Sequence, residues 1–193
     1  NNDALSNYTS LDKELAEDIP LKPFPAPETV VIPVSMHAGA PAKPVVQVGD
    51  TVKKGQLIAE ASAFISANVH SSVSGTVIAI EPRPHSKGVD VEAIVIKNDG
   101  LDTLADSVKP AKPLEELTPE EIVAIVKDAG ITGMGGAGFP THVKLSPKEP
   151  EKIDRIIANC AECEPYLTSD YRRMMEEPEK LVAGLKIILG LFP

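Results

Sequence analysis

A glycine-rich stretch at residues 130–145, GITGMGGAGFPTHVKL, has the composition of a ligand-binding loop. Side chains are missing at Gly133, Gly135, Gly136 and Gly138. Glycines permit positive φ and expose backbone N–H groups, so a phosphate or a flat ring can lie directly against the main chain. Phe139 and Lys144 add an aromatic ring and a positive charge. A flexible turn would need only two such residues, so the length of the run favours a ligand-binding loop.

The same stretch contains the Gly-x-Gly-x-x-Gly pattern of dinucleotide-binding folds, at positions 133, 135 and 138. In those folds the pattern follows a strand and opens a helix. Here Thr118, Pro119 and the glutamates at 120 and 121 predict the start of a helix, which ends at Gly130. The glycines therefore follow a helix, and the sequence does not predict a Rossmann nucleotide site.

A second candidate site follows residues 153–160, IDRIIANC, which are predicted to form a buried strand of an α/β domain. Asn159, Glu162 and Glu164 then lie at or beyond the carboxyl end of that strand, where ligands bind in open α/β sheets. An asparagine amide can pair with the imide edge of a heteroaromatic ring, and carboxylates can accept from ribityl or ribose hydroxyls. The alternative for the two glutamates is a solvated turn.

Cys160 and Cys163 form a Cys-x-x-Cys pair, which occurs in redox sites, zinc sites and iron–sulfur sites. Either kind of metal site usually needs four ligands. The chain has no other cysteine, and its histidines at 37, 70, 85 and 142 lack ligand spacing. We therefore expect no metal site, no catalytic side chain at this pair, and thiols that pack against the glycine loop.

The composition of the 193 residues, 42% hydrophobic and 24% charged, is that of a soluble globular protein with one or two domains. A net charge of −9 argues against nucleic-acid binding through phosphate neutralisation. The sequence has no run of roughly 18 to 20 apolar residues and no signal peptide at its start. Two cysteines fit a reducing, cytosolic setting.

The chain divides into four segments that differ in composition and residue pattern. Residues 1–27 form an acidic, proline-rich arm that is predicted to be extended, with a possible short helix near 10–18. Residues 28–100 are β-branched and alternating, which predicts a small barrel or sandwich. Residues 101–117 form a linker, and residues 118–193 begin an α/β domain. Within it, residues 170–192 have the spacing of an amphipathic, core-facing helix broken near Pro178. The expected fold class is mixed α+β and α/β.

The β region contains VxxGDxVxxGQ at 46–56 and HSSVSGTVIAIEP at 70–82. These motifs resemble the biotinyl/lipoyl-type barrel, a barrel-sandwich hybrid. Carrier domains of that type present an attachment lysine on the hairpin between the two halves. This chain has no lysine between Lys54 and Lys87. We therefore expect the barrel to serve as a scaffold or a contact surface.

Taken together, GITGMGGAGFPTHVKL and the following NCAECEPYLTSDYRRM (159–174) closely resemble the C-subunit family of Rnf electron transport complexes. They resemble more distantly the flavin-bearing, NADH-oxidising subunit of respiratory complex I. The resemblance extends upstream through HAGAPAKPVVQVGDTVKKGQ and SGTVIAIEPRPH, and so covers about residues 28–193.

The resemblance implies a subunit of an ion-pumping ferredoxin:NAD oxidoreductase, with FMN and NADH as cofactors. It places Gly133, Gly135, Gly136 and Gly138 around the FMN, with Lys144 as a nearby charge partner. Asn159 would contact the flavin, Phe139 would stack near the nicotinamide dinucleotide, and Glu162 and Glu164 would bound the nucleotide pocket. Met134 and Ala161 depart from the complex I relative, which carries an arginine and an aspartate there.

The resemblance also implies a peripheral location on the cytoplasmic face of the inner membrane, without a membrane span. The implied partners are the other Rnf subunits and, indirectly, ferredoxin. The family's 4Fe-4S cysteines would lie beyond residue 193, so the chain looks like an N-terminal fragment that is inactive by itself and able to self-associate. Two alternatives stay open: a non-catalytic assembly module, and a flavin-dependent cobalamin reductase of the related type.

Overall fold

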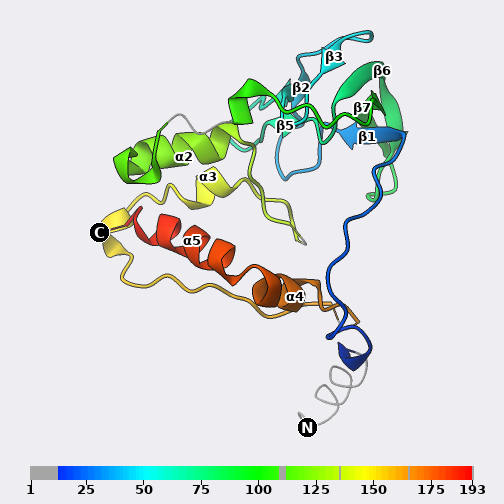
Figure 1. Cartoon of the computed structure of the whole chain (residues 1–193). Coiled ribbons are helices and arrows are strands. Elements are labelled where there is room, and N and C mark those ends of the chain that lie inside the picture. Colours follow the sequence, from blue (N-terminus) through cyan, green and yellow to red (C-terminus); the bar gives the residue numbers. More distant parts are fainter. Residues whose placement is uncertain (1–12, 109–111, 135, 165, 193) are drawn as a thin grey trace. The chain divides into compact units, whose positions relative to one another are not determined.

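The computed structural model describes residues 13–108, 112–134, 136–164 and 166–192 (Figure 1). They fall into two units. The barrel unit is Ala26–Lys148, and the helical unit consists of residues 13–25 together with 149–192. Each unit is described below by itself. The glycine loop belongs to the barrel unit, and the second candidate segment belongs to the helical unit.

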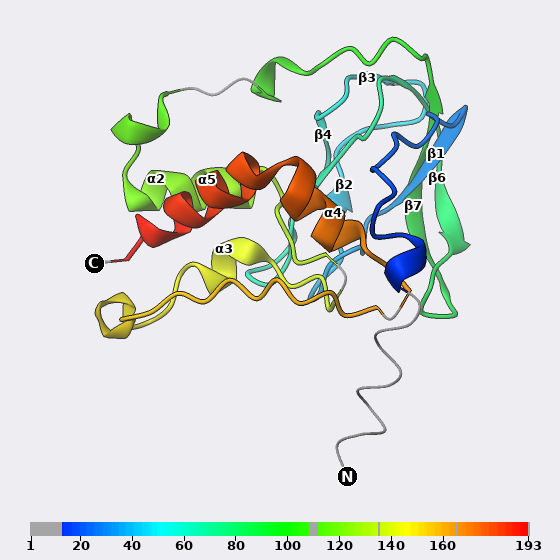
Figure 2. The ribbon, with the colours of Figure 1, turned by 60° about the horizontal axis from the view of Figure 1, so that its bottom comes forward.

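Two antiparallel sheets form the barrel. The strands of the first sheet, in spatial order, are β1 (Thr29–Pro33), β7 (Asp90–Asn98), β6 (Gly75–Pro84) and β3 (Thr51–Val52). Those of the second are β2 (Lys43–Pro44), β4 (Leu57–Glu60) and β5 (Val69–His70). Figures 1 and 2 both show β1, β6 and β7 side by side. The predicted barrel-sandwich hybrid is confirmed.

Branched aliphatic side chains fill the space between the sheets. Ile32 of β1 pairs with Ile94 of β7, and Val77 of β6 pairs with Ile96, also of β7. The fully or almost fully buried members of this core include Val52, Ile58, Val69, Val77, Ile94 and Ile96. Each such side chain contributes roughly 1.5–3 kcal/mol to folding through its burial. Burial alternates at the start of β6, whereas four consecutive residues of β7, Ala93–Ile96, are buried.

The predicted helix after the barrel is α2 (Pro119–Asp128). Thr118 and Glu121 form a capping box: the Thr118 side chain accepts from the Glu121 backbone, and the Glu121 carboxylate accepts from the Thr118 backbone. The Lys112 ammonium, aided by the Thr118 backbone, lowers the pKa of the Glu121 carboxyl. Gly130, with φ +65°, follows the helix. The predicted start and end are therefore confirmed. Short 3-10 turns precede α2 at Asp106–Val108 (η2) and Leu114–Glu116 (η3).

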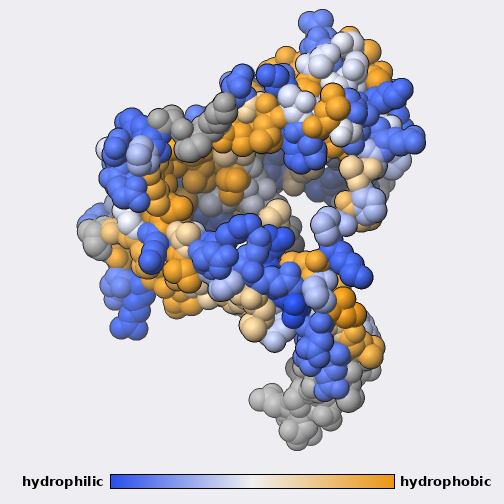
Figure 3. All heavy atoms as spheres, viewed as in Figure 1, coloured by the Kyte–Doolittle hydropathy of each residue, from blue (hydrophilic) through white to orange (hydrophobic). Residues whose placement is uncertain are grey.

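The helical unit contains α4 (Ser169–Glu176) and α5 (Pro178–Leu189), with 3-10 turns η1 (Lys13–Leu15) and η4 (Pro150–Lys152). The break between α4 and α5 confirms the predicted interruption at Pro178, where the proline stands at the first position of the new helix. The apolar residues Leu181, Val182 and Leu189 of α5 are exposed. The described residues therefore do not bear out the prediction that this helix faces a core, and Figure 3 shows hydrophobic residues at the surface of both units.

The strand predicted at residues 153–160 is wrong. The segment is irregular, and Ile157 is 86% exposed. No described strand pairs with it. A strand depends on a neighbour to satisfy its backbone N–H and C=O groups, and the apolar run alone cannot supply one.

Within the part of the chain that the structure describes, none of the helices combines the length and the apolarity needed to cross a membrane.

Candidate functional site

The glycine loop begins where α2 ends and closes on itself at its base. Thr132 and Pro140 form an antiparallel bridge. The backbone N–H of Gly133 donates to the Phe139 carbonyl at 3.0 Å, and Thr141 donates to the Ile131 carbonyl at 2.9 Å. The short helix α3 (Thr141–Lys144) follows directly. The two ends of the loop are therefore held together, and Met134, Gly136 and Ala137 are the described residues of its exposed tip.

The tip of the loop is open. Met134 is 96% exposed, and Gly136 and Ala137 are exposed as well. A Cβ on Gly136 would meet no atom within 4 Å, and the φ of Gly136 is not in the left-handed region. The backbone N–H groups of Gly136 and Ala137 donate to no described residue. Nothing in the described fold therefore requires glycine at position 136.

Lys144 brings a positive charge to the inner side of this loop. A Cβ on Gly133 would lie 3.8 Å from the Lys144 Nζ and 3.8 Å from the Phe139 nitrogen. The Lys144 side chain is exposed and forms no ion pair with a described residue. The Lys144 ammonium thus lies beside Gly133, and the Lys144 side chain is exposed.

Gly138 has a different role from Gly136. Its φ is +63°, and a Cβ there would lie 3.0 Å from the Met36 carbonyl oxygen and 3.2 Å from the His37 Cα. Its own carbonyl accepts a hydrogen bond from the Ala38 backbone at 3.0 Å. Glycine is required at this position by the packing of the loop against the barrel, with or without a ligand.

The second candidate segment lies in the helical unit. Asn159 is exposed, and its Oδ1 accepts from the Ala161 backbone at 3.1 Å, which closes a small turn. Glu162 reaches the N-terminus of α4: its Oε2 accepts from the backbone of Asp170 at 2.8 Å and of Tyr171 at 3.3 Å. Thr168, the residue before α4, provides no side-chain cap, so Glu162 takes that role.

Both cysteines of this segment are exposed. Their predicted packing against the glycine loop, which belongs to the other unit, stays a prediction. The Cys163 Sγ donates to the Glu164 Oε2 at 2.7 Å. This hydrogen bond, together with burial and the Glu164 charge, raises the pKa of the Cys163 thiol. A raised pKa disfavours the thiolate, which is the reactive form. Among the described residues, no cluster of three or more His, Cys, Asp or Glu side chains could hold a metal ion.

Residues 13–21 of the N-terminal arm are hydrogen-bonded to the rest of the same unit. The Lys13 ammonium donates to the carbonyls of Glu164 at 2.9 Å and Leu167 at 2.7 Å. Further along, the Leu21 backbone donates to Glu176, and the Arg172 guanidinium donates to the Glu17 carbonyl. Figure 2 shows η1 beside α4. The hydrogen bonds from the Leu21 backbone and from Arg172 lower the pKa of the Glu176 carboxyl.

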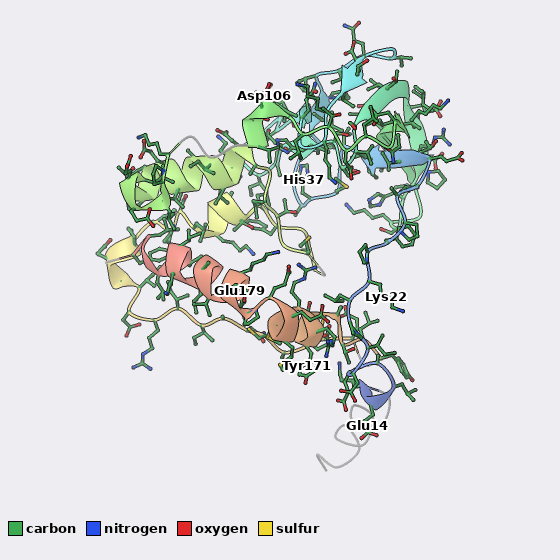
Figure 4. All side chains as sticks on the ribbon, viewed as in Figure 1. Glu14, Lys22, His37, Asp106, Tyr171 and Glu179 are labelled. Carbon is green, nitrogen blue, oxygen red and sulfur yellow. The ribbon has the colours of Figure 1, made fainter. Side chains whose placement is uncertain are left out.

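A pocket of about 270 Å³ opens between this arm and α4. Its lining residues are Lys13, Glu17, Cys160, Glu162, Leu167, Thr168, Tyr171 and Met174. Tyr171 is labelled on α4 in Figure 4. The polar groups of Lys13 and Glu162 are engaged with the backbone around the pocket. Glu162 is the one predicted site residue among the pocket's described lining.

The predicted site residues thus form two groups. Gly133, Gly136, Gly138, Phe139 and Lys144 come together in the barrel unit, whereas Asn159, Glu162 and Glu164 come together in the helical unit. Gly135 lies outside the described residues.

The sequence analysis did not predict two residues that support these groups. Lys13 supports the second segment from more than 150 residues away. Asn68 donates to the Asp128 carbonyl, 60 residues later, at the end of the helix that leads into the glycine loop. Neither contact has a local pattern that could have revealed it.

Comparison with known proteins gives consistent matches along the chain. Residues 8–101 match the RnfC barrel sandwich hybrid domain, and residues 126–192 match the Nuo51 FMN-binding domain. The second match begins within α2 and includes the glycine loop and the second candidate segment.

Among curated relatives, the C subunit of the Na⁺-translocating ferredoxin:NAD⁺ oxidoreductase complex of Acetobacterium woodii is 49% identical over 177 residues, which are 92% of this chain and 40% of the relative. The C subunit of the proton-translocating complex of Clostridium ljungdahlii is 49% identical over 179 residues, 93% of this chain and 39% of the relative. The C subunit of the ion-translocating oxidoreductase complex of Pseudomonas aeruginosa is 39% identical over 182 residues, which are 93% of this chain and 23% of the relative. The chain thus spans about 40% of the length of the first two.

Proposed function

Because this chain belongs to the family of C subunits of Rnf-type ion-translocating oxidoreductase complexes, we propose that it supplies the FMN- and NADH-binding part of an electron-transport subunit. In this function the whole subunit passes electrons between NAD(H) and iron–sulfur carriers. Its 4Fe-4S clusters would be held outside these 193 residues, and its partners would be the other Rnf subunits and, through them, ferredoxin. It would act as a peripheral subunit on the cytoplasmic face of the membrane.

The observation that carries the proposal is the open tip of the glycine loop. Gly136 faces open space, and the N–H groups of Gly136 and Ala137 have no acceptor among the described residues. Lys144 adds an ammonium group beside Gly133. Unused N–H groups and a nearby cation suit a phosphorylated, planar ligand, because they can bind its phosphate while the bare main chain approaches its ring. The residues present therefore fit FMN.

The chain's own residues would bind and orient the reactants. Lys144 and the N–H groups of the tip would hold the flavin, and Phe139 would stack near the nicotinamide dinucleotide. When bound, FMN would supply the conversion between hydride transfer and one-electron transfer. The chain would hold the hydride donor and the flavin in register, which raises their effective concentration.

The second segment would also contribute ligand contacts. Asn159 would contact the flavin, and Glu164 would bound the nucleotide. Glu162 has a divided role: Oε2 caps α4, whereas Oε1 hydrogen-bonds to no described residue and is free to accept from a ribose hydroxyl. This division would let one carboxylate both fix the helix and contact the nucleotide.

The test is to measure FMN binding by the full-length protein that contains this chain, with and without Gly136→Val. A side chain at position 136 meets open space in the fold. We therefore expect the unfolding midpoint of the FMN-free protein to stay unchanged, while FMN affinity falls by about tenfold or more because the side chain fills the ligand's place. Gly136→Ala should give a smaller loss.

Equal FMN affinity in wild type and Gly136→Val would contradict FMN binding at the tip of the glycine loop, and would favour a non-catalytic assembly module. Absence of FMN binding by the wild-type protein would contradict the proposed function outright.

A further inference from the structure

Two neighbouring loops of the barrel contact the two ends of the glycine loop. One, the β1–β2 loop, comprises residues 34–42, and the other, the β4–β5 hairpin, comprises residues 61–68. The hairpin lies between the two barrel motifs, where carrier barrels of the resembling type bear their attachment lysine. Here its residues 61–68, ASAFISAN, contain no lysine. The contacts that it makes instead define a role for it.

The first end of the glycine loop lies against Asn68. The Asn68 Oδ1 accepts from the Ala61 backbone at 2.9 Å, which closes the hairpin, and its Nδ2 donates to the Asp128 carbonyl at the end of α2 at 3.1 Å. Gly130, two residues further on, passes so close that a Cβ would lie 2.2 Å from the Asn68 carbonyl oxygen. One asparagine thus joins the barrel to the point where the glycine loop begins.

The second end of the glycine loop lies against the β1–β2 loop. Ala38 donates to the Gly138 carbonyl, and Gly138 packs on Met36 and His37 without room for a side chain. Both ends of the glycine loop are therefore held by the barrel, at points eight residues apart. Between these two points, a Cβ on Gly136 would meet nothing within 4 Å, so the barrel leaves the space at this position open.

The two barrel loops are also tied to each other. Ala40 donates to the Ile65 carbonyl at 3.0 Å, and the Ser66 hydroxyl donates to the Ala40 carbonyl at 2.8 Å. The His37 ring lies 3.2 Å from the Ser66 Oγ, and both side chains are buried. Figure 4 shows His37 in the loop that follows β1. Buried, mutually satisfied polar groups of this kind hold a single conformation, because breaking one leaves another without a partner.

We propose that the β4–β5 hairpin positions the glycine loop for its ligand, and that Asn68 is the positioning residue that transmits the barrel's rigidity to the loop. The proposal rests on the proposed function, since the loop must bind FMN for its position to matter. The barrel then acts as the rigid scaffold that holds the glycine loop of the cofactor site. The loop's own hydrogen bonds join its two ends to each other, and the contacts with the barrel fix where that joined base lies. The open tip can therefore be held in a binding position without contacts of its own.

Asn68→Asp tests this role in the full-length protein. The aspartate keeps the oxygen that accepts from Ala61, but it replaces the donor to Asp128 with an oxygen that faces a carbonyl oxygen. Ser62→Ala is the matched control, because it removes the 2.6 Å hydrogen bond to the Pro41 carbonyl between the same two barrel loops without touching α2. We expect FMN affinity to fall about tenfold in Asn68→Asp, the loss of one hydrogen bond, and to stay near wild type in Ser62→Ala.

The visible circular dichroism per bound FMN is the second readout, because after normalisation to the amount of bound flavin it responds to the geometry of the flavin site and not to the amount of folded protein. We expect it to change in Asn68→Asp and not in Ser62→Ala. Asn68→Ser, which is shorter and uncharged, replaces Asn68→Asp if the latter does not fold, with the same expected direction. Wild-type affinity and an unchanged spectrum in the folded Asn68 variants, with FMN bound by wild type, would overturn this inference and leave the proposed function standing. A wild-type protein that binds no FMN would instead overturn the proposed function.

Discussion

Glu162 lies across the N-terminus of α4, with its Oε2 2.8 Å from the backbone nitrogen of Asp170. The first N–H groups of a helix have no partner within the helix, and a carboxylate is favoured there by both hydrogen bonding and the helix dipole. A residue that the sequence suggests for nucleotide binding therefore also holds local structure. Any variant of Glu162 must be interpreted with this second role in mind.

Glu162→Ala is expected to destabilise α4 by about 0.5–2 kcal/mol, the usual cost of losing a cap. Amide hydrogen exchange at Asp170 and Tyr171 measures this directly, and both should exchange faster. Glu162→Gln keeps an accepting oxygen and should preserve most of the protection. Unchanged exchange at both amides in Glu162→Ala would show that the cap does not form in solution.

Gly138→Ala is expected to destabilise the protein by roughly 1–2 kcal/mol. An alanine at φ +63° is strained, and its Cβ would crowd the Met36 carbonyl at 3.0 Å. Gly136→Ala, in the same loop, faces open space and should stay within about 0.5 kcal/mol of wild type. Chemical denaturation of the FMN-free protein compares the two variants. If both lose the same stability, the contact between Gly138 and the barrel loop is not formed.

The sequence predicted correctly those parts of the fold that are determined by neighbouring residues in the chain. The Thr118-Pro119 start of α2 and its stop at Gly130 follow from capping and from glycine's access to positive φ. The break at Pro178 follows from proline's missing N–H. The barrel strands follow from their β-branched residues and, at the start of β6, from the alternation of buried and exposed positions.

Nonlocal causes account for what the sequence did not predict. The apolar run at residues 153–160 predicted a strand, but no described strand pairs with this segment, and the run itself carries no information about a pairing partner. The glycines at 136 and 138 look alike in the sequence, yet only Gly138 is required by packing, because the Met36 carbonyl that excludes its side chain lies about a hundred residues earlier. The contact of Lys13 with the Glu164 carbonyl and the donation from Asn68 to Asp128 are likewise set by the fold alone.

Glu164→Gln is expected to make Cys163 more reactive. The Glu164 carboxylate raises the pKa of the Cys163 thiol through a hydrogen bond and through its charge. A neutral amide removes the charge and weakens the hydrogen bond, so the pKa falls and the thiolate fraction at pH 8 rises. The rate of alkylation by iodoacetamide, measured in a Cys160→Ser background, should increase. An equal or lower rate would mean that Glu164 does not control this thiol.

His142 makes the stability of the barrel unit depend on pH. Burial, together with repulsion from Lys127, lowers the pKa of His142, and a hydrogen bond to the Phe64 backbone opposes the shift only in part. Burial likewise lowers the pKa of His70 against the opposing charge of Asp128. An unfolded histidine titrates near 6.5, so below that pH the unfolded chain binds more protons than the folded one.

The stability that these neutral histidines contribute should therefore be complete above about pH 6.5. The free energy of unfolding should decrease as the pH falls from there towards the lowered pKa values of the folded state. Denaturation curves at pH 7.5 and pH 5.5 should differ in this direction, and the difference should shrink in His142→Gln, which cannot take up the proton. NMR titration of the His142 ring gives the independent check. A ring pKa at or above 6.5 in the folded protein would remove the cause, since the folded state would then bind at least as many protons as the unfolded state at this residue.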